Sequence, residues 1–172
     1  MVNVPPAAIV RFYAPGDFDD LVARWHETNR VSYPYVAEHQ RHTLAEARDF
    51  FMDHVLDRCR VWVAECSGQL RGMLALEAPW IRQLAVFPEA QRQGIGALLL
   101  RSAREASPDE LRLFTFQRNA AARAFYAKHG FAPLAFGVSP APESEPDVEL
   151  RWFAGRAAPS ATADGRSGPL MT

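Results

Sequence analysis

Two glycines in a short polar segment are the residues of this sequence that point most directly to ligand chemistry. The segment Gln91-Arg-Gln-Gly94-Ile-Gly96 follows an apolar run that ends at Pro88 and precedes a run with helical periodicity. Glycines let the backbone turn sharply and leave its amides uncovered by side chains. A helix that begins near Gly94 directs unpaired N–H groups and the positive end of its dipole into this loop, and Arg92 adds a full charge. The segment therefore predicts a pyrophosphate site whose donors are the amides of Gln91 through Ala97.

The common phosphate-binding motifs do not match this segment, but one family pattern does. The dinucleotide fingerprint requires a third glycine, which Ala97-Leu98-Leu99 does not supply, and the P-loop requires Gly-Lys-Ser/Thr. The segment resembles the acyl-CoA site of the GCN5-related N-acetyltransferases (GNAT family), whose pattern Gln/Arg-x-x-Gly-x-Gly/Ala is met here by Gln91, Gly94 and Gly96. The run that ends at Pro88 and the downstream segment 119–131 resemble the same family in the same order and spacing. The resemblance covers about residues 8–153.

A second pair of candidate residues lies in the downstream segment. Asn119 and Tyr126 are seven residues apart, which is two turns of a helix and therefore one face. The resemblance implies that Asn119 hydrogen-bonds the pantetheine or pyrophosphate region and that Tyr126 is the general acid for the departing thiolate. Asn119 is also a good helix N-cap, and the two roles can coexist.

The family resemblance also implies how the thioester arm is held. In the family the central strand splays from the next strand, and the arm pairs with the open edge, here through the backbones of Leu84 and Val86. The residues expected to contact acetyl-CoA are Leu84, Ala85, Val86, Gln91, Arg92, Gln93, Gly94, Ile95, Gly96, Ala97, Asn119 and Tyr126.

The general base is less well defined by the sequence. A primary ammonium has a pKa of ~10, so a base or a water chain must remove its proton before attack. Glu77 is the first candidate because it ends the strand beside the turn into the central strand. Glu27 and His26 are the alternatives, and a surface or capping role remains open for all three.

The acceptor is expected to contact Gln83 and two variable regions. In this family, acceptor selectivity usually comes from the loop between the first two helices and from the hairpin before the last strand. Aromatic rings beside carboxylates in these regions suit a cationic amine, although a solvated acidic loop is an equally good interpretation. The residues concerned are Tyr33, Tyr35, His39, Glu143, Glu145 and Asp147.

The elements that position these residues follow from hydrophobic periodicity and turn signals. Helices are expected from an N-cap at Asp17 to about Arg30, from the capping box at Thr43, from Gly94 to Ala106, and from the cap at Asn119. The strands are expected at 8–13, 60–66, 69–77, 80–88, 111–116, 131–136 and 147–153. The resemblance implies an α/β (α+β) GNAT fold with a mixed sheet of about seven strands and about four helices, splayed between the fourth and fifth strands.

Composition limits the remaining classes. The 172 residues fit one domain, expected at 1–154, with a flexible tail at 155–172 that is rich in Gly, Ala, Ser and Pro. A net charge of −1 argues against a nucleic-acid partner. The lack of a long apolar run or signal peptide predicts a cytoplasmic protein without a membrane partner. Cys59 and Cys66 are expected to be free thiols, and no residue spacing suggests a metal site.

These observations predict a direct acetyl transfer in a ternary complex, from acetyl-CoA to the primary amine of a small molecule. Two alternatives remain open: an acetyltransferase acting on protein N-termini or lysines, and a non-catalytic acyl-CoA-binding sensor. Members of the family are often dimers, so a homodimer also remains open.

Overall fold

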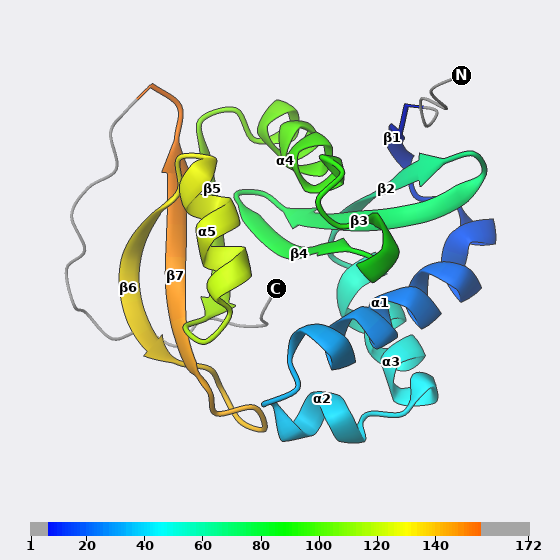
Figure 1. Cartoon of the computed structure of the whole chain (residues 1–172), viewed down its shortest axis with the longest axis horizontal. Coiled ribbons are helices and arrows are strands. Elements are labelled where there is room, and N and C mark those ends of the chain that lie inside the picture. The colour runs from blue at the N-terminus through cyan, green and yellow to red at the C-terminus, as the bar shows by residue number, and fades with distance from the viewer. Residues whose placement is uncertain (1–6, 156–172) are drawn as a thin grey trace.

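A computed structural model describes residues 7–155 and shows one seven-stranded sheet with helices on both faces (Figure 1). The strand order is β1-β2-β3-β4-β5-β7-β6. The strands are β1 (Ile9–Phe12), β2 (Arg60–Cys66), β3 (Gln69–Glu77), β4 (Trp80–Val86), β5 (Glu110–Phe116), β6 (Ala132–Val138) and β7 (Pro146–Phe153). The helices are α1 (Phe18–Ser32), α2 (Ala37–Arg41), α3 (Leu44–Phe50), α4 (Ile95–Ala106) and α5 (Ala120–Lys128). The predicted fold class and number of strands are confirmed.

Two apolar layers hold the helices against the sheet. On one face, α4 and α5 pack on the sheet through Leu99, Leu100 and Tyr126, which meet Leu111 and Leu113 of β5. On the other face, α1 and α3 pack on β2 to β4 through side chains such as Leu21, Trp25 and Phe51. Both helical stripes recur at three- and four-residue spacing, which is why each helix buries one side only.

Local signals set several helix ends as predicted. Thr43 and Glu46 form a capping box, with the Thr43 hydroxyl accepting from the Glu46 N–H at 3.3 Å. Asn119 caps α5 by accepting from the Ala122 N–H at 3.0 Å, and Gly130 follows α5 with φ +80°. The capping role of Asn119 is therefore confirmed.

Three features of the helices differ from expectation. The short helix α2 makes five helices where about four were predicted, because the chain resumes helical turns after the break at Pro34. The helix opened at Thr43 ends as a π-helical turn, Phe51–Leu56. Asp17 precedes α1 but does not cap it, because its carboxylate accepts from the Ala14 N–H at 2.8 Å and pairs with Arg11.

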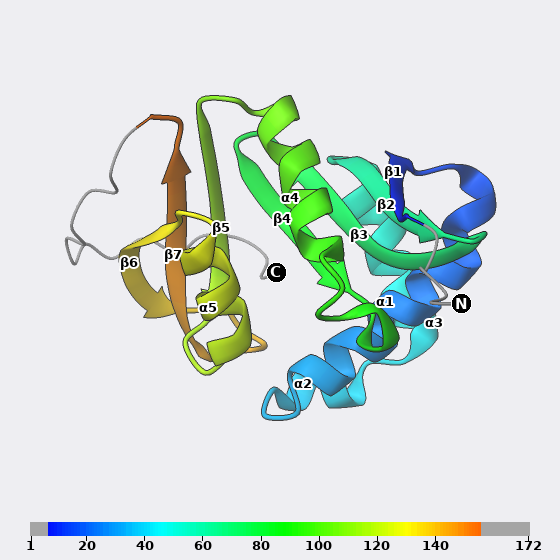
Figure 2. The ribbon, with the colours of Figure 1, turned by 45° about the horizontal axis from the view of Figure 1, so that its top comes forward.

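The strands β4 and β5 separate after a single paired position. Trp80 pairs with Arg112 in parallel register, and the Arg112 N–H donates to the Pro79 carbonyl at 2.9 Å. Beyond that point the two strands diverge (Figure 2). The predicted splay between the fourth and fifth strands is confirmed, and it leaves one edge of β4 open along most of its length.

Several predictions concern the ends of the chain and its general class. Nearly all of the predicted tail at 155–172 lies outside the described residues. Among the helices of residues 7–155, none is long and apolar enough to cross a membrane. Cys59 and Cys66 are half-buried thiols, as predicted, and burial raises the pKa of the Cys59 thiol to about 11.

Candidate active site

The glycine loop presents uncovered backbone at the start of α4. Gly94 is the N-cap residue of α4 and has φ +85°, a conformation that favours glycine, and Arg92 also has a positive φ of 64°. A Cβ atom built on Gly94 would meet nothing within 4 Å, so a side chain there would project into the space in front of the helix. The first amides of α4 thus face an open region, which suits phosphate oxygens.

The second glycine of the loop has a packing role that the sequence did not indicate. A Cβ atom on Gly96 would lie 3.0 Å from the ring of Phe125, so the missing side chain lets α5 approach α4 closely. This contact holds the start of α4 beside the helix that carries Asn119 and Tyr126. The two predicted cofactor segments are therefore adjacent in space.

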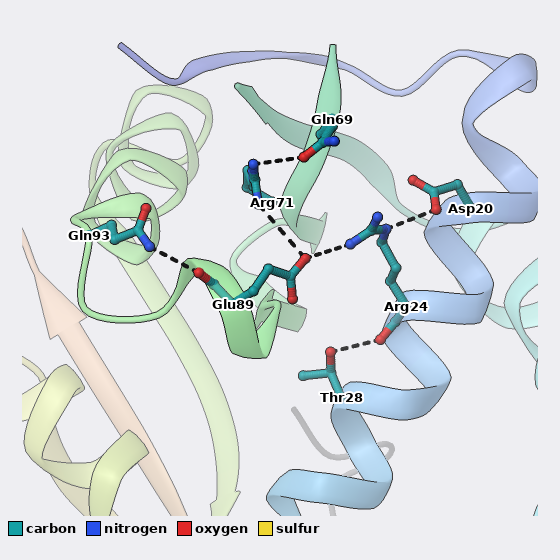
Figure 3. A network of polar contacts seen from close by, with 7 residues as sticks. All are labelled: Asp20, Arg24, Thr28, Gln69, Arg71, Glu89 and Gln93. Atoms are coloured by element: carbon teal, nitrogen blue, oxygen red, sulfur yellow. Dashed lines mark hydrogen bonds and ion pairs between the residues drawn. The ribbon is translucent and has the colours of Figure 1, made fainter. Parts of the chain in front are cut away.

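A polar network fixes the loop relative to α1 and β3 (Figure 3). The Glu89 carboxylate pairs with Arg24 of α1 at 2.5 Å and lies 4.0 Å from Arg71 of β3. The Gln93 side chain donates to the Glu89 carbonyl at 2.9 Å, and Arg24 also pairs with Asp20 at 2.8 Å. These exposed ion pairs each contribute little stability, but together they define where the loop sits.

The open edge of β4 carries the backbone groups that the resemblance assigns to the thioester arm. The Phe87 N–H donates to the Arg71 carbonyl, so the alternation along a strand directs the polar backbone groups of Leu84 and Val86 to the opposite edge, toward β5. The Gln91 side chain donates to the Val86 carbonyl at 3.2 Å. Gln91 thus satisfies one acceptor of this edge. The edge and the glycine loop together fit an extended chain that ends in phosphates.

Asn119 and Tyr126 both contact the same residue, Tyr33. The side chain of Asn119 is in hydrogen-bonding contact with the Tyr33 phenol, and the Tyr33 and Tyr126 phenols interact electrostatically. Burial raises the pKa of both phenols well above the ordinary value for tyrosine. Tyr126 is 3% exposed, so its hydroxyl keeps its proton at neutral pH. That protonation state is the one a general acid requires.

A pocket lies beside β4, on the face covered by α1 and α3. It encloses about 80 Å³, and α1, α2, α3, β4 and the loop between β6 and β7 all contribute to its wall. The Trp25 indole donates to the Gln83 side chain at 3.2 Å, and the His26 Nε2 donates to the His42 carbonyl at 2.8 Å. The lining residues are Trp25, His26, Asn29, Tyr33, His39, His42, Ala47, Phe50, Gln83 and Glu143.

The structure gathers only part of the predicted acceptor set into this pocket. Tyr33, His39, Glu143 and Gln83 line it. The other predicted residues, Tyr35, Glu145 and Asp147, do not line it. The Arg118 guanidinium lies over the Tyr35 ring at 4.4 Å and 3.8 Å from the Glu145 carboxylate. The Asp147 side chain is buried beside Gly137.

The predicted base candidates are also separated by the structure. The Glu77 carboxylate pairs with Arg82 at 2.8 Å near the closed end of the splay and does not line the pocket. Glu27 is exposed and lies 3.6 Å from Arg30, outside the pocket wall. His26 is the one member of this set that reaches the pocket. No group of His, Cys, Asp and Glu among the described residues is arranged to hold a metal ion.

Several lining residues were not identified from the sequence. Trp25 and Asn29 lie eight and four residues before Tyr33, which was predicted, so all three share one face of α1 and its extension. This spacing is the signal that could have found them. Ala47, Phe50 and His42 give no comparable signal, because only the packing of α3 against α1 brings them to the pocket.

Comparisons with known proteins agree with this architecture. A family profile described as "Acetyltransferase (GNAT) domain" matches residues 57–133. The peptidyl-lysine N-acetyltransferase YiaC of Escherichia coli is 29% identical over 113 residues, which cover 64% of this chain and 74% of YiaC. The apo form of YjaB from E. coli superposes with a TM-score of 0.72 at 22% identity, over 87% of this chain and 99% of YjaB.

A neighbour with a ligand supports the same assignment of the fold. The PaiA N-acetyltransferase from Thermoplasma acidophilum, solved in complex with coenzyme A, superposes with a TM-score of 0.60 at 20% identity, over 83% of this chain and 98% of PaiA. The profile covers the β4 edge, the glycine loop and the Asn119–Tyr126 segment described above. The GNAT profile over residues 57–133, the curated relative and the superposed structures together support a GCN5-related N-acetyltransferase, which is an acyltransferase.

Proposed function

We propose that this enzyme transfers the acetyl group of acetyl-CoA directly to the primary amine of a small molecule within a ternary complex. The observation that carries the proposal is the pocket beside the open edge of β4. Its wall combines one residue of β4, Gln83, with residues of the segment from Tyr33 to His42, which covers it. A small, covered pocket favours a small acceptor over an extended peptide, which would need an open groove.

The residues proposed to hold acetyl-CoA lie along one continuous path. The amides of Gln91 through Ala97 and the side chain of Arg92 would bind the diphosphate, and the backbones of Leu84, Ala85 and Val86 would pair with the arm. Asn119 would contact the arm from α5. The support is the uncovered backbone at Gly94 and at the β4 edge.

Tyr126 is proposed as the general acid. Its phenol is buried, protonated and adjacent to Tyr33, which lines the acceptor pocket. Acetyl transfer forms a C–N bond and breaks the C–S bond, so the departing thiolate must receive a proton. Tyr126 can supply that proton from the side of α5, between the arm and the acceptor.

One observation favours a second acceptor class. YiaC is a peptidyl-lysine N-acetyltransferase, and it is 29% identical to this chain over 113 residues. A lysine side chain could enter the pocket only if the peptide were accommodated outside the cover formed by Tyr33 to His42.

The proposal is tested by thiol release from acetyl-CoA with a panel of amines. The panel contains spermidine, L-lysine, benzylamine, a peptide with a free N-terminus, and an N-acetylated peptide with one lysine. We expect turnover with a small amine and a kcat for Tyr126→Phe at least tenfold lower, with the Kd of CoA by calorimetry changed less than twofold. Tyr13→Phe, which removes a phenol far from the site, is the control.

Other outcomes decide between the alternatives. Turnover confined to the peptides would replace the small-molecule acceptor by a protein amine. Tight CoA binding without turnover on any amine would indicate a sensor.

A further inference from the structure

Two side chains from distant parts of the sequence meet in the acceptor pocket. The His39 Nε2 of α2 lies 3.2 Å from the Glu143 Oε1 in the loop between β6 and β7. Their side chains are only 17% and 20% exposed, and both line the pocket. A histidine beside a largely buried carboxylate can accept a proton because the carboxylate stabilises the resulting imidazolium.

The imidazole is also close to the proposed acid. The His39 ring centroid lies 5.2 Å from that of Tyr33 and 6.3 Å from that of Phe116. Tyr33 in turn interacts with the Tyr126 phenol. Tyr33 therefore interacts both with His39 and with the residue proposed to protonate the thiolate, and Gln83 of β4 lies in the same pocket wall.

The charged groups around His39 come from each element packed against it. His26 and Tyr33 face the pocket from α1, and His42 lies there paired with Glu38 of α2 at 3.0 Å. Glu143 approaches His39 from the loop between β6 and β7, and Asp147 interacts electrostatically with Glu143. Arg118 lies nearby, but it stacks on Tyr35 and pairs with Glu145. The ion-pair partner of His39 is thus the Glu143 carboxylate.

We propose that His39 is the general base that deprotonates the acceptor ammonium and that Glu143 is its positioning residue. The ammonium gives one proton to His39 and becomes an amine, whose lone pair forms the C–N bond to the carbonyl carbon of the thioester. As the C–S bond breaks, sulfur keeps the electron pair and takes the proton of Tyr126. The second proton lost by nitrogen restores the Tyr126 phenol, and His39 releases its proton to solvent. This inference rests on the proposed function.

The other candidates for the base are less well placed. Glu77 is engaged by Arg82 outside the pocket, and Glu27 also lies outside it. His26 lines the pocket, but its ring donates to a backbone carbonyl, which stabilises an imidazolium less than a carboxylate does. His26 is therefore the rival that the experiment must exclude.

The test compares the pH profiles of kcat/KM of the wild type and its variants, measured with the amine of the panel that the wild type acetylates most rapidly. At pH 7 we expect His39→Gln to lower kcat/KM about 100-fold, because general base catalysis is typically worth that much. Its rate should then rise about tenfold per pH unit toward pH 9, as free amine accumulates in solution. Glu143→Gln should lower kcat/KM about tenfold and should not show that rise with pH, because its His39 is still present to accept the proton.

Controls separate a chemical role from a structural one. The Kd of CoA for His39→Gln should stay within twofold of wild type, and His54→Gln, an exposed histidine of the π-helical turn, should match wild type throughout. Unchanged kcat/KM and pH profile in His39→Gln would overturn the inference. A 100-fold loss in His26→Gln together with a mild loss in His39→Gln would overturn it in favour of His26. A lack of turnover by the wild-type enzyme on every amine would instead refute the proposed function.

Discussion

The glycine loop and the acceptor pocket both border β4, but they are built from different parts of the chain. The loop uses backbone amides from seven consecutive residues, Gln91 to Ala97, held at the start of one helix. The pocket uses side chains from positions as far apart as Trp25 and Glu143. The first site is local and depends on the absence of side chains, whereas the second depends on which side chains the tertiary structure brings together.

In the proposed function, this difference separates binding of the common donor from selection of the acceptor. A site made of backbone tolerates many sequence changes provided that glycine stays where the conformation needs it. A site made of side chains changes its preference with each substitution. Mutations in the two regions should therefore affect different kinetic parameters, and the first two of the three predictions below test whether they do.

The largest effect is expected for Gly94→Val. Its side chain would occupy the space in front of α4, so the Kd of CoA should rise about 100-fold, equivalent to roughly 3 kcal/mol. The control is Gly68→Val in the turn between β2 and β3, because Gly68 has φ +74° and an equally open Cβ position. Both variants should lose stability through backbone strain, about 1–2 kcal/mol. Similar CoA affinities in the two variants, measured by calorimetry, would refute the assigned role of the loop.

A smaller effect, on the acceptor only, is expected for Trp25→Phe. The change removes the indole donor to Gln83 and enlarges the pocket, so the KM of the amine should rise about tenfold while the Kd of CoA stays within twofold. Trp62→Phe is the matched control, because Trp62 is 7% exposed against 6% for Trp25 and packs in the other apolar layer. An equal rise of the amine KM in both variants would show that a general loss of core packing, and not the change in the pocket, raises the KM.

The smallest effect is expected for Asp147→Asn, a change of stability. Burial raises the pKa of the Asp147 carboxyl, and the nearby Glu143 and Glu149 raise it further. At a pH above the ordinary aspartate pKa of ~3.9, the Asp147 carboxyl ionises more readily in the unfolded chain than in the folded one. The wild type therefore loses stability as the pH rises through the pKa of Asp147 in the folded state. The variant should therefore gain free energy of unfolding at pH 7 and very little at pH 3.

Urea titrations at both pH values measure this difference. Asp109→Asn, an exposed aspartate, serves as the control and should show no such gain. A gain that is equal at pH 3 and pH 7 would contradict the assigned cause.

Patterns close together in the sequence allowed much of the fold to be predicted. The hairpin of β2 and β3, the capping box at Thr43 and the cap at Asn119 are each set by interactions within a few residues. Asp17 was misjudged as a cap because its true partner, Arg11, belongs to β1 across the turn. The helix α2 was missed because its five residues, one alanine and four polar residues, carry no apolar periodicity.

The sequence by itself determined the family resemblance, the order of the elements and the glycine loop, because each depends on residue types at short and fixed spacing. Only the tertiary structure decided which residues form the acceptor pocket, since α1, α2, α3 and the loop before β7 meet there through packing over more than a hundred residues. It likewise separated Glu77 from the pocket and brought His39 to Glu143, because the partner of a side chain depends on the folded neighbourhood and not on its distance along the chain.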